Sequence, residues 1–141
     1  MNAPVSLEQP QVVKLTARDF LLLDDAGAFA AYGKTELIDG VIRAVNAQHR
    51  PYGYAKNELA YRLRRALEEL GSDLFVWTEA SVEAAIDSVP EPDIMLAPPD
   101  KRPGVVPATA AALVVEVSAS TQRLDLGPKA RIYARAGIPE Y

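Results

Sequence analysis

The sequence contains no cysteine and a single histidine among its 141 residues. Without thiols there can be no disulfide, no thiolate nucleophile and no cysteine-type zinc site. One imidazole, that of His49, cannot build a multi-histidine metal site, and it disfavours a serine–histidine–aspartate triad. His49 falls in a segment with loop character, so its simplest interpretation is a surface residue.

The chain also lacks a long apolar run and an excess of basic charge. No window of about 18 apolar residues exists, so we expect no membrane-spanning helix. The first ten residues, MNAPVSLEQP, lack the basic and apolar regions of a secretory signal, which favours a cytoplasmic location. The net charge of −4 argues against a nucleic-acid coat protein. It does not exclude a nuclease, because carboxylates that hold Mg²⁺ themselves make a protein acidic.

Apolar residues make up 49% of the chain, enough for one domain with a single core. Residues 1–14 hold two prolines and little pattern, so we expect a flexible N-terminal arm. Residues 15–141 mix helical and strand-like patterns and predict an α/β domain. Its first short helix should begin at a capping box formed by Thr16 and Asp19.

The clearest helix is expected over residues 56–70, where leucines recur along one face and Gly71 ends the pattern. Lys56 and three arginines are expected on its outer side. They are either simply solvated or able to follow a phosphate backbone. The arginines are Arg62, Arg64 and Arg65.

A β-hairpin is expected over residues 35–45, because two apolar runs flank the dipeptide Asp39-Gly40. A two-residue turn there places Glu36 opposite Arg43. Glu36 is therefore either a cross-strand ion-pair partner of Arg43 or a catalytic acid.

The stretch from residue 113 to residue 129 combines a strand, a turn and a helix start. Residues 111–115 read as a buried strand that Glu116 interrupts and Val117 continues, and residues 118–122 form a polar turn. Gly127-Pro128 then begins a helix that ends at Gly137. Within this helix an inner face is shared by Lys129, Ile132, Tyr133 and Ala136, whereas Arg131 and Arg135 lie off it.

Two carboxylates therefore lie near the ends of buried strands. Glu116 can meet Lys129 over the end of the sheet, either in a functional site or in a structural ion pair that closes the corner. Asp93 follows Pro92 at the start of a short strand and is otherwise a strand-initiating turn residue. Two carboxylates and a lysine suit Mg²⁺-dependent phosphodiester hydrolysis, because Mg²⁺ binds through one or two carboxylates and keeps several waters.

At these positions the chain resembles a known family. The matching motifs are TELIDG (35–40), PD (92–93), VEVS (115–118), ST (120–121), Asp125, Lys129 and YARAGIPEY (133–141). In order and spacing they are similar to the Uma-two-type restriction endonucleases, a branch of the PD-(D/E)XK nuclease superfamily. The resemblance runs from about Leu15 to the last residue.

The resemblance implies a restriction-endonuclease-like core, with a mixed central β-sheet flanked by α-helices. It implies hydrolysis of DNA phosphodiester bonds with Mg²⁺, or Mn²⁺ in its place. Asp93 and Glu116 would be the metal carboxylates, Lys129 the superfamily lysine moved from the strand to the following helix, and Glu36 an additional acid. The alternative is a catalytically inactive module that keeps the fold to bind nucleic acid or protein.

The sequence departs from the family pattern at three places. Ala119 stands where members usually have proline, and Tyr52 stands where many have histidine. Members continue past the Pro-Glu-Tyr sequence into another core strand, whereas this sequence ends at Tyr141. We therefore expect residues 15–141 to lack the final strand or strands of the sheet. The edge left open would allow pairing in a homodimer.

Overall fold

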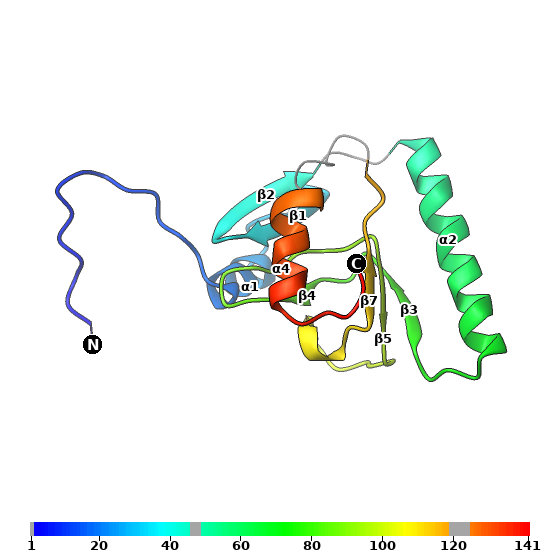
Figure 1. Cartoon of the computed structure of the whole chain (residues 1–141). Coiled ribbons are helices and arrows are strands. Elements are labelled where there is room, and N and C mark those ends of the chain that lie inside the picture. Colours follow the sequence, from blue (N-terminus) through cyan, green and yellow to red (C-terminus); the bar gives the residue numbers. More distant parts are fainter. Residues whose placement is uncertain (1, 46–48, 119–124) are drawn as a thin grey trace.

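The computed structural model describes residues 2–45, 49–118 and 125–141 of the chain (Figure 1). None of the helices in these ranges is both long enough and apolar enough to cross a membrane. In chain order the elements are α1 (Ala17–Asp25), β1 (Lys34–Ile38), β2 (Val41–Val45), α2 (Arg50–Glu69), β3 (Phe75–Thr78), β4 (Val82–Glu83), β5 (Ile94–Ala97), β6 (Val106–Pro107), a 3₁₀ turn (Ala108–Ala110), β7 (Leu113–Val115), a π-helical turn (Asp125–Lys129) and α4 (Ala130–Arg135).

The central sheet consists of three antiparallel strands in the order β3-β5-β7. On one face, leucines of α2 pack against Val76 and Ile94. On the other face, Met95 and Val114 pack with Tyr133 of α4. The sheet thus lies between two helices, as Figure 1 shows. The predicted α/β fold class is confirmed.

Parallel pairing occurs outside the antiparallel ladder of the three strands of the central sheet. β4 pairs in parallel with β6, and a parallel bridge joins Leu113 of β7 to Glu140. The backbone N–H of Val114 donates to the Glu140 carbonyl at 3.1 Å. The segment after α4 therefore lies along the outer edge of β7, where the sequence led us to expect an unpaired edge. The three strands of the central sheet are antiparallel, so within the described ranges the mixed central sheet that the resemblance implies is approached only through this bridge at its edge. The combination of helices with antiparallel sheets is consistent with a restriction-endonuclease-like fold.

The β1–β2 hairpin has the predicted register, with Ile38 opposite Val41 across a two-residue turn. Asp39 and Gly40 both have positive φ angles, 49° and 77°, as a type I′ turn requires. β1 is tied to the rest of the domain by Leu37 and Val89, whose backbone groups exchange hydrogen bonds of 3.2 and 2.8 Å. This contact brings Glu36 beside the segment that leads into β5.

The close packing around Gly40 gives a stability prediction. A Cβ at position 40 would lie 2.9 Å from the Lys14 Cβ and 3.2 Å from the Leu15 carbonyl oxygen, at a φ of +77°. We expect Gly40→Ala to lower the free energy of unfolding by about 2 kcal/mol or more, through backbone strain and overlap together. Gly27→Ala is the matched control, because Gly27 has a φ of +79° with nothing within 4 Å of a Cβ. Denaturant unfolding should give about 1 kcal/mol for the control, and equal losses would contradict the steric argument.

Several predicted boundaries need correction. α2 begins at Arg50 rather than at residue 56, because Pro51 occupies its first turn, where a missing N–H costs nothing. His49 is exposed at the N-cap and makes no side-chain capping bond, in agreement with a surface role. The strand before Glu116 spans only Leu113–Val115. The last helix is preceded by the π-helical turn instead of starting directly at Pro128.

Further predictions concern the N-terminal residues and the segments at the edges of the described ranges. The capping box of Thr16 and Asp19 is present. Residues 2–14 contain no helix or strand and are mostly exposed, but their flexibility stays a prediction. The predicted polar turn over 118–122 and the motif residues Ser120 and Thr121 fall largely or wholly among residues 119–124, outside the described ranges. Residues 46–48, which precede His49 in the segment predicted to have loop character, are outside them too.

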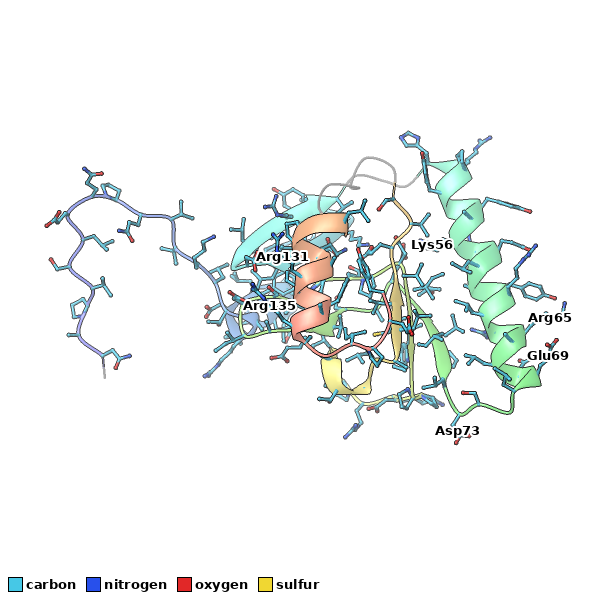
Figure 2. All side chains as sticks on the ribbon, in the orientation of Figure 1. Lys56, Arg65, Glu69, Asp73, Arg131 and Arg135 are labelled. Carbon is cyan, nitrogen blue, oxygen red and sulfur yellow. The ribbon has the colours of Figure 1, made fainter. Side chains whose placement is uncertain are left out.

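The outer face expected for Lys56 is wrong. Lys56 is buried, and Figure 2 shows it pointing from α2 toward the sheet, whereas Arg65 and Glu69 point away. Arg131 and Arg135 are exposed on α4, as predicted. One basic residue of α2 therefore belongs to the interior and not to a solvated face.

Candidate active site

Glu36 is almost fully buried on β1, with 1% of its surface exposed. Its Oε1 accepts a hydrogen bond of 2.8 Å from the backbone N–H of Glu91 and one of 2.9 Å from Lys129 Nζ. Arg43 is its register partner across the hairpin, as predicted. Among the described residues, however, the cation paired with Glu36 is Lys129, so of the two alternatives the ion pair with Arg43 is not the one observed.

Lys129 connects Glu36 of β1 with Glu116, the residue that follows β7. Its ammonium group pairs with Glu36 on one side and with Glu116 on the other, and only 2% of its side chain is exposed. Burial acts to lower the pKa of Lys129, but attraction to Glu116 and Glu36, with hydrogen bonds to both, outweighs it and raises this pKa above its ordinary value of 10.5. The lysine is therefore held charged between the two carboxylates. The ion pair of Glu116 with Lys129 that the sequence suggested is present.

Tyr133 supports the same carboxylate from α4. Its hydroxyl donates to Glu116 Oε1 at 2.8 Å, and its ring is fully buried in the core. Burial raises the pKa of this hydroxyl far above its usual value, and the neighbouring charge of Glu116 adds to the effect, so the group stays a donor. The sequence placed Tyr133 on the inner face with Lys129 but gave it no role. Its i, i+4 spacing from Lys129 was the available signal.

Asp93 lies directly before β5 and is buried. Its Oδ2 accepts a 2.7 Å hydrogen bond from the backbone N–H of Val117, the residue after Glu116. β5 pairs with β7 so that Ile94 is opposite Val115, and continuing this antiparallel register by one step brings Asp93 opposite Glu116. Residues at such positions have Cβ atoms about 5 Å apart. The fold thus brings together the two carboxylates that the sequence singled out.

The end of β3 adds an ion pair between Glu79 and Lys56, which was not predicted from the sequence. Thr78 of β3 is opposite Ile94, and the next backbone N–H, that of Glu79, donates to the Asp93 carbonyl at 3.1 Å. The Glu79 carboxylate receives a 2.7 Å hydrogen bond from Lys56 Nζ, which lowers the pKa of Glu79. Glu79 also has a φ of 54°, an uncommon conformation for a residue with a side chain.

Glu91 and Lys34 complete the charged surroundings of Asp93. Lys34 Nζ lies 3.9 Å from Asp93 Oδ1. Burial raises the pKa of the Glu91 carboxyl to about 7, and the charges of Glu36 and Glu79 contribute, against the opposing attraction of Lys34. Neither residue was predicted from the sequence to belong to the site, although each lies only two positions from a predicted site residue.

The oxygen ligands present are of the kind that Mg²⁺ binds. Among the residues that the structure describes, no cluster of three or more carboxylate, histidine or cysteine groups forms a ready cage for a metal. Mg²⁺ does not require such a cage, because it commonly takes one or two carboxylates and keeps water in its other positions. Asp93 and Glu116 offer hard oxygen ligands from facing positions at one end of the sheet, and they fit this requirement.

Comparison with protein families agrees with the geometry. Residues 17–141 match the model of the Uma2 family, which carries the description "Putative restriction endonuclease". The chain belongs to the Uma2 family. The resemblance stated from the motifs is thereby confirmed, and Glu36, Asp93, Glu116 and Lys129 all lie within the matched range. Membership of Uma2 points to nuclease activity. No curated protein matches the chain.

Proposed function

We propose that this Uma2 chain is a Mg²⁺-dependent endonuclease that hydrolyses DNA phosphodiester bonds, with Asp93 and Glu116 as the metal ligands. The observation that carries the proposal is the meeting of these two carboxylates at facing strand ends, beside the buried pair of Glu36 and Lys129. Mn²⁺ is expected to replace Mg²⁺. The cytoplasmic location expected from the sequence belongs to the same proposal.

Each residue has a distinct task in this proposal. A bound divalent cation would polarise the phosphate and lower the pKa of a bound water. Glu116 is held in place by Lys129 and by the Tyr133 hydroxyl, so its side chain is already fixed in one conformation before a ligand binds. Asp93 is fixed by the Val117 N–H. Glu36 holds Lys129 in place, and Lys129 in turn orients Glu116. Both residues therefore act through a metal ligand and not by direct contact with the metal.

The second candidate is a catalytically inactive module that binds nucleic acid or protein. The enclosure of Lys129 favours it, because a lysine with 2% of its side chain exposed does not reach a substrate in this conformation. The two candidates differ in their response to metal. An inactive module should bind no Mg²⁺ or Mn²⁺ at Asp93 and Glu116.

We expect the purified chain to nick or linearise supercoiled plasmid DNA in Mg²⁺ and to lose this activity in EDTA. Calorimetry should show one Mn²⁺ site, and Mn²⁺ should raise the melting temperature, because a ligand that binds only the folded state stabilises it. An unchanged plasmid together with no heat of Mn²⁺ binding would refute the nuclease proposal and favour the inactive module. A homodimer stays a prediction, and light scattering on the same sample tests it.

A further inference from the structure

Three lysines approach the carboxylates of the site, and they are held to different degrees. Lys129 Nζ is 2.9 Å from Glu36 and also pairs with Glu116, with 2% of its side chain exposed. Lys56 Nζ is 2.7 Å from Glu79, with 11% exposed. Both distances are those of charge-assisted hydrogen bonds. Lys34 Nζ is 3.9 Å from Asp93, beyond hydrogen-bond range, with 20% exposed. Lys34 is therefore the least constrained of the three.

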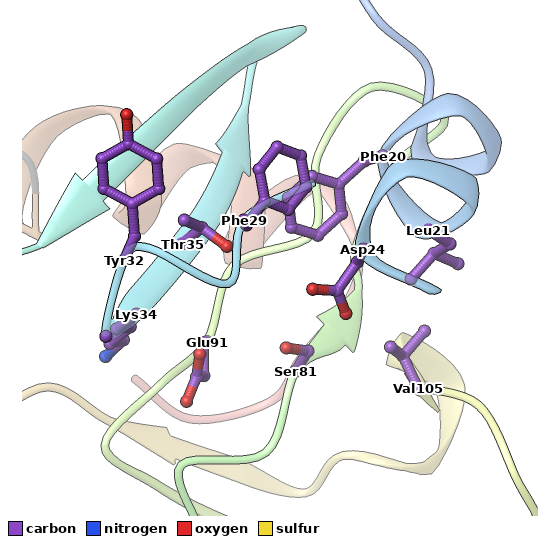
Figure 3. A pocket seen from close by; sticks show the side chains of 11 residues that line it. Phe20, Leu21, Asp24, Phe29, Tyr32, Lys34, Thr35, Ser81, Glu91 and Val105 are labelled. Atoms are coloured by element: carbon purple, nitrogen blue, oxygen red, sulfur yellow. The ribbon is translucent and has the colours of Figure 1, made fainter. Parts of the chain in front are cut away.

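The position of Lys34 on β1 directs it to the same region as Glu36. Residues two apart on a strand point to one face, so β1 presents Lys34 and Glu36 together. Beside Lys34 lies an open pocket of about 170 Å³ whose other polar walls include Thr35, Ser81 and Glu91 (Figure 3). Asp24 faces this pocket as well. Lys34 thus lies close to Asp93 and also lines a space that a ligand can enter.

A divalent cation on Asp93 would change the surroundings of Lys34. The lysine now lies 3.9 Å from the carboxylate that would take the cation. A cation there would replace this attraction by repulsion at short range. The ammonium group has the open side of the pocket into which to move, where the carboxylates of Asp24 and Glu91 also lie. A substrate phosphate bound at the metal would offer a further anion beside it.

We propose that Lys34 leaves Asp93 when metal binds and contacts a phosphate oxygen of the nucleic-acid substrate beside the metal carboxylates. This inference rests on the proposed function, since it assumes a nucleic-acid substrate at Asp93 and Glu116. The two lysines then have different roles: Lys129 positions Glu116, whereas Lys34 contacts the substrate. The lysine of β1, and not that of the last helix, then supplies the phosphate contact.

The test compares Lys34→Met, Lys34→Arg and the control Lys101→Met, which removes the same charge from an exposed loop. Binding of a fluorescent DNA duplex is measured over a series of salt concentrations, with Ca²⁺ in place of Mg²⁺ as a cation of equal charge that also takes oxygen ligands. We expect Lys34→Met to weaken binding about tenfold and to reduce the slope of log K against log salt by about 1. Lys34→Arg should keep the slope, and Lys101→Met should leave binding and slope unchanged.

The other outcomes separate this inference from the nuclease proposal. Unchanged duplex binding in Lys34→Met, with tighter Mn²⁺ binding, would show that Lys34 only balances the charge of Asp93, and would overturn the inference while the nuclease proposal stands. An equal loss in Lys101→Met would also overturn it, because the effect would then be a general one of net charge. The parent chain could also bind DNA without cutting it, with a smaller salt slope in Lys34→Met. That result would support the phosphate contact of Lys34 and refute the nuclease proposal. A parent that binds no duplex would refute both.

Discussion

Lys129→Met is expected to lower the free energy of unfolding by about 3–5 kcal/mol at pH 7 without metal. The substitution keeps most of the side-chain volume but removes the cation that lies between Glu36 and Glu116. Both carboxylates are nearly inaccessible to water, so each would be left as an uncompensated buried charge. Urea unfolding followed by circular dichroism measures the loss.

Two comparisons give this prediction its controls. Arg131→Met removes a charge from the exposed face of the same helix and should change stability by no more than about 0.5 kcal/mol. Adding Glu36→Gln to Lys129→Met removes one of the stranded charges and should restore part of the loss. A Lys129→Met protein as stable as Arg131→Met would contradict this prediction and show that the ion pairs of Lys129 contribute little to stability.

The loss in Lys129→Met should also depend on pH in a defined direction. Without the lysine, two close buried carboxylates should have pKa values above those of the unfolded chain. A group with a raised folded-state pKa holds its proton more tightly when folded, so stability falls as pH rises through that interval. The difference between Lys129→Met and the parent should therefore shrink as the pH is lowered from 7 toward 5.

The hairpin and the last helix were predictable because short-range rules determine them. An Asp-Gly turn fixes the register of β1 and β2, and that register alone places Glu36 opposite Arg43. The inner face of α4 follows from 3.6-residue spacing, which correctly separated Lys129 and Tyr133 from Arg131. The family motifs then supplied the assignment of Asp93 and Glu116.

Lys56 was misplaced although the signal was present. Leu59 and Leu63 follow Lys56 by three and seven residues, so all three share the face of α2 that packs on the sheet. The charge of Lys56 outweighed this spacing in the prediction. The structure shows that its partner is Glu79, whose position after β3 cannot be inferred from α2 alone.

The remaining contacts depend on topology that no local pattern encodes. Glu36 pairs with Lys129 and not with Arg43, which was one of two alternatives, because β1 lies beside Val89. This contact brings Glu36 to Glu91 and Lys129 instead of leaving it on an isolated hairpin. Lys34 approaches Asp93 for the same reason. The positive φ of Glu79 also had no signal, since the position holds neither glycine nor asparagine.

Asp93→Asn is expected to have the largest effect on cleavage, a fall of about a thousandfold in the Mg²⁺-dependent rate. Loss of a charged metal ligand removes several kcal/mol of stabilisation from the transition state. The asparagine carbonyl can still accept the hydrogen bond that Val117 now donates to Oδ2, so the melting temperature should change by only a few degrees. Plasmid cleavage and Mn²⁺ calorimetry on the folded variant measure the two losses, and both should occur together.

Tyr133→Phe is expected to have an intermediate effect on cleavage, smaller than that of Asp93→Asn. It keeps the buried ring but removes the hydroxyl that donates to Glu116 Oε1, so Glu116 retains Lys129 and loses one of its supports. Partners that orient metal ligands contribute about 10- to 100-fold, so cleavage should fall by that factor while Mn²⁺ still binds. If Asp93→Asn cut DNA within tenfold of the parent, Asp93 would not be a metal ligand. The metal would then have to lie on other carboxylates at this end of the sheet, with Glu79 and Glu91 the first to replace.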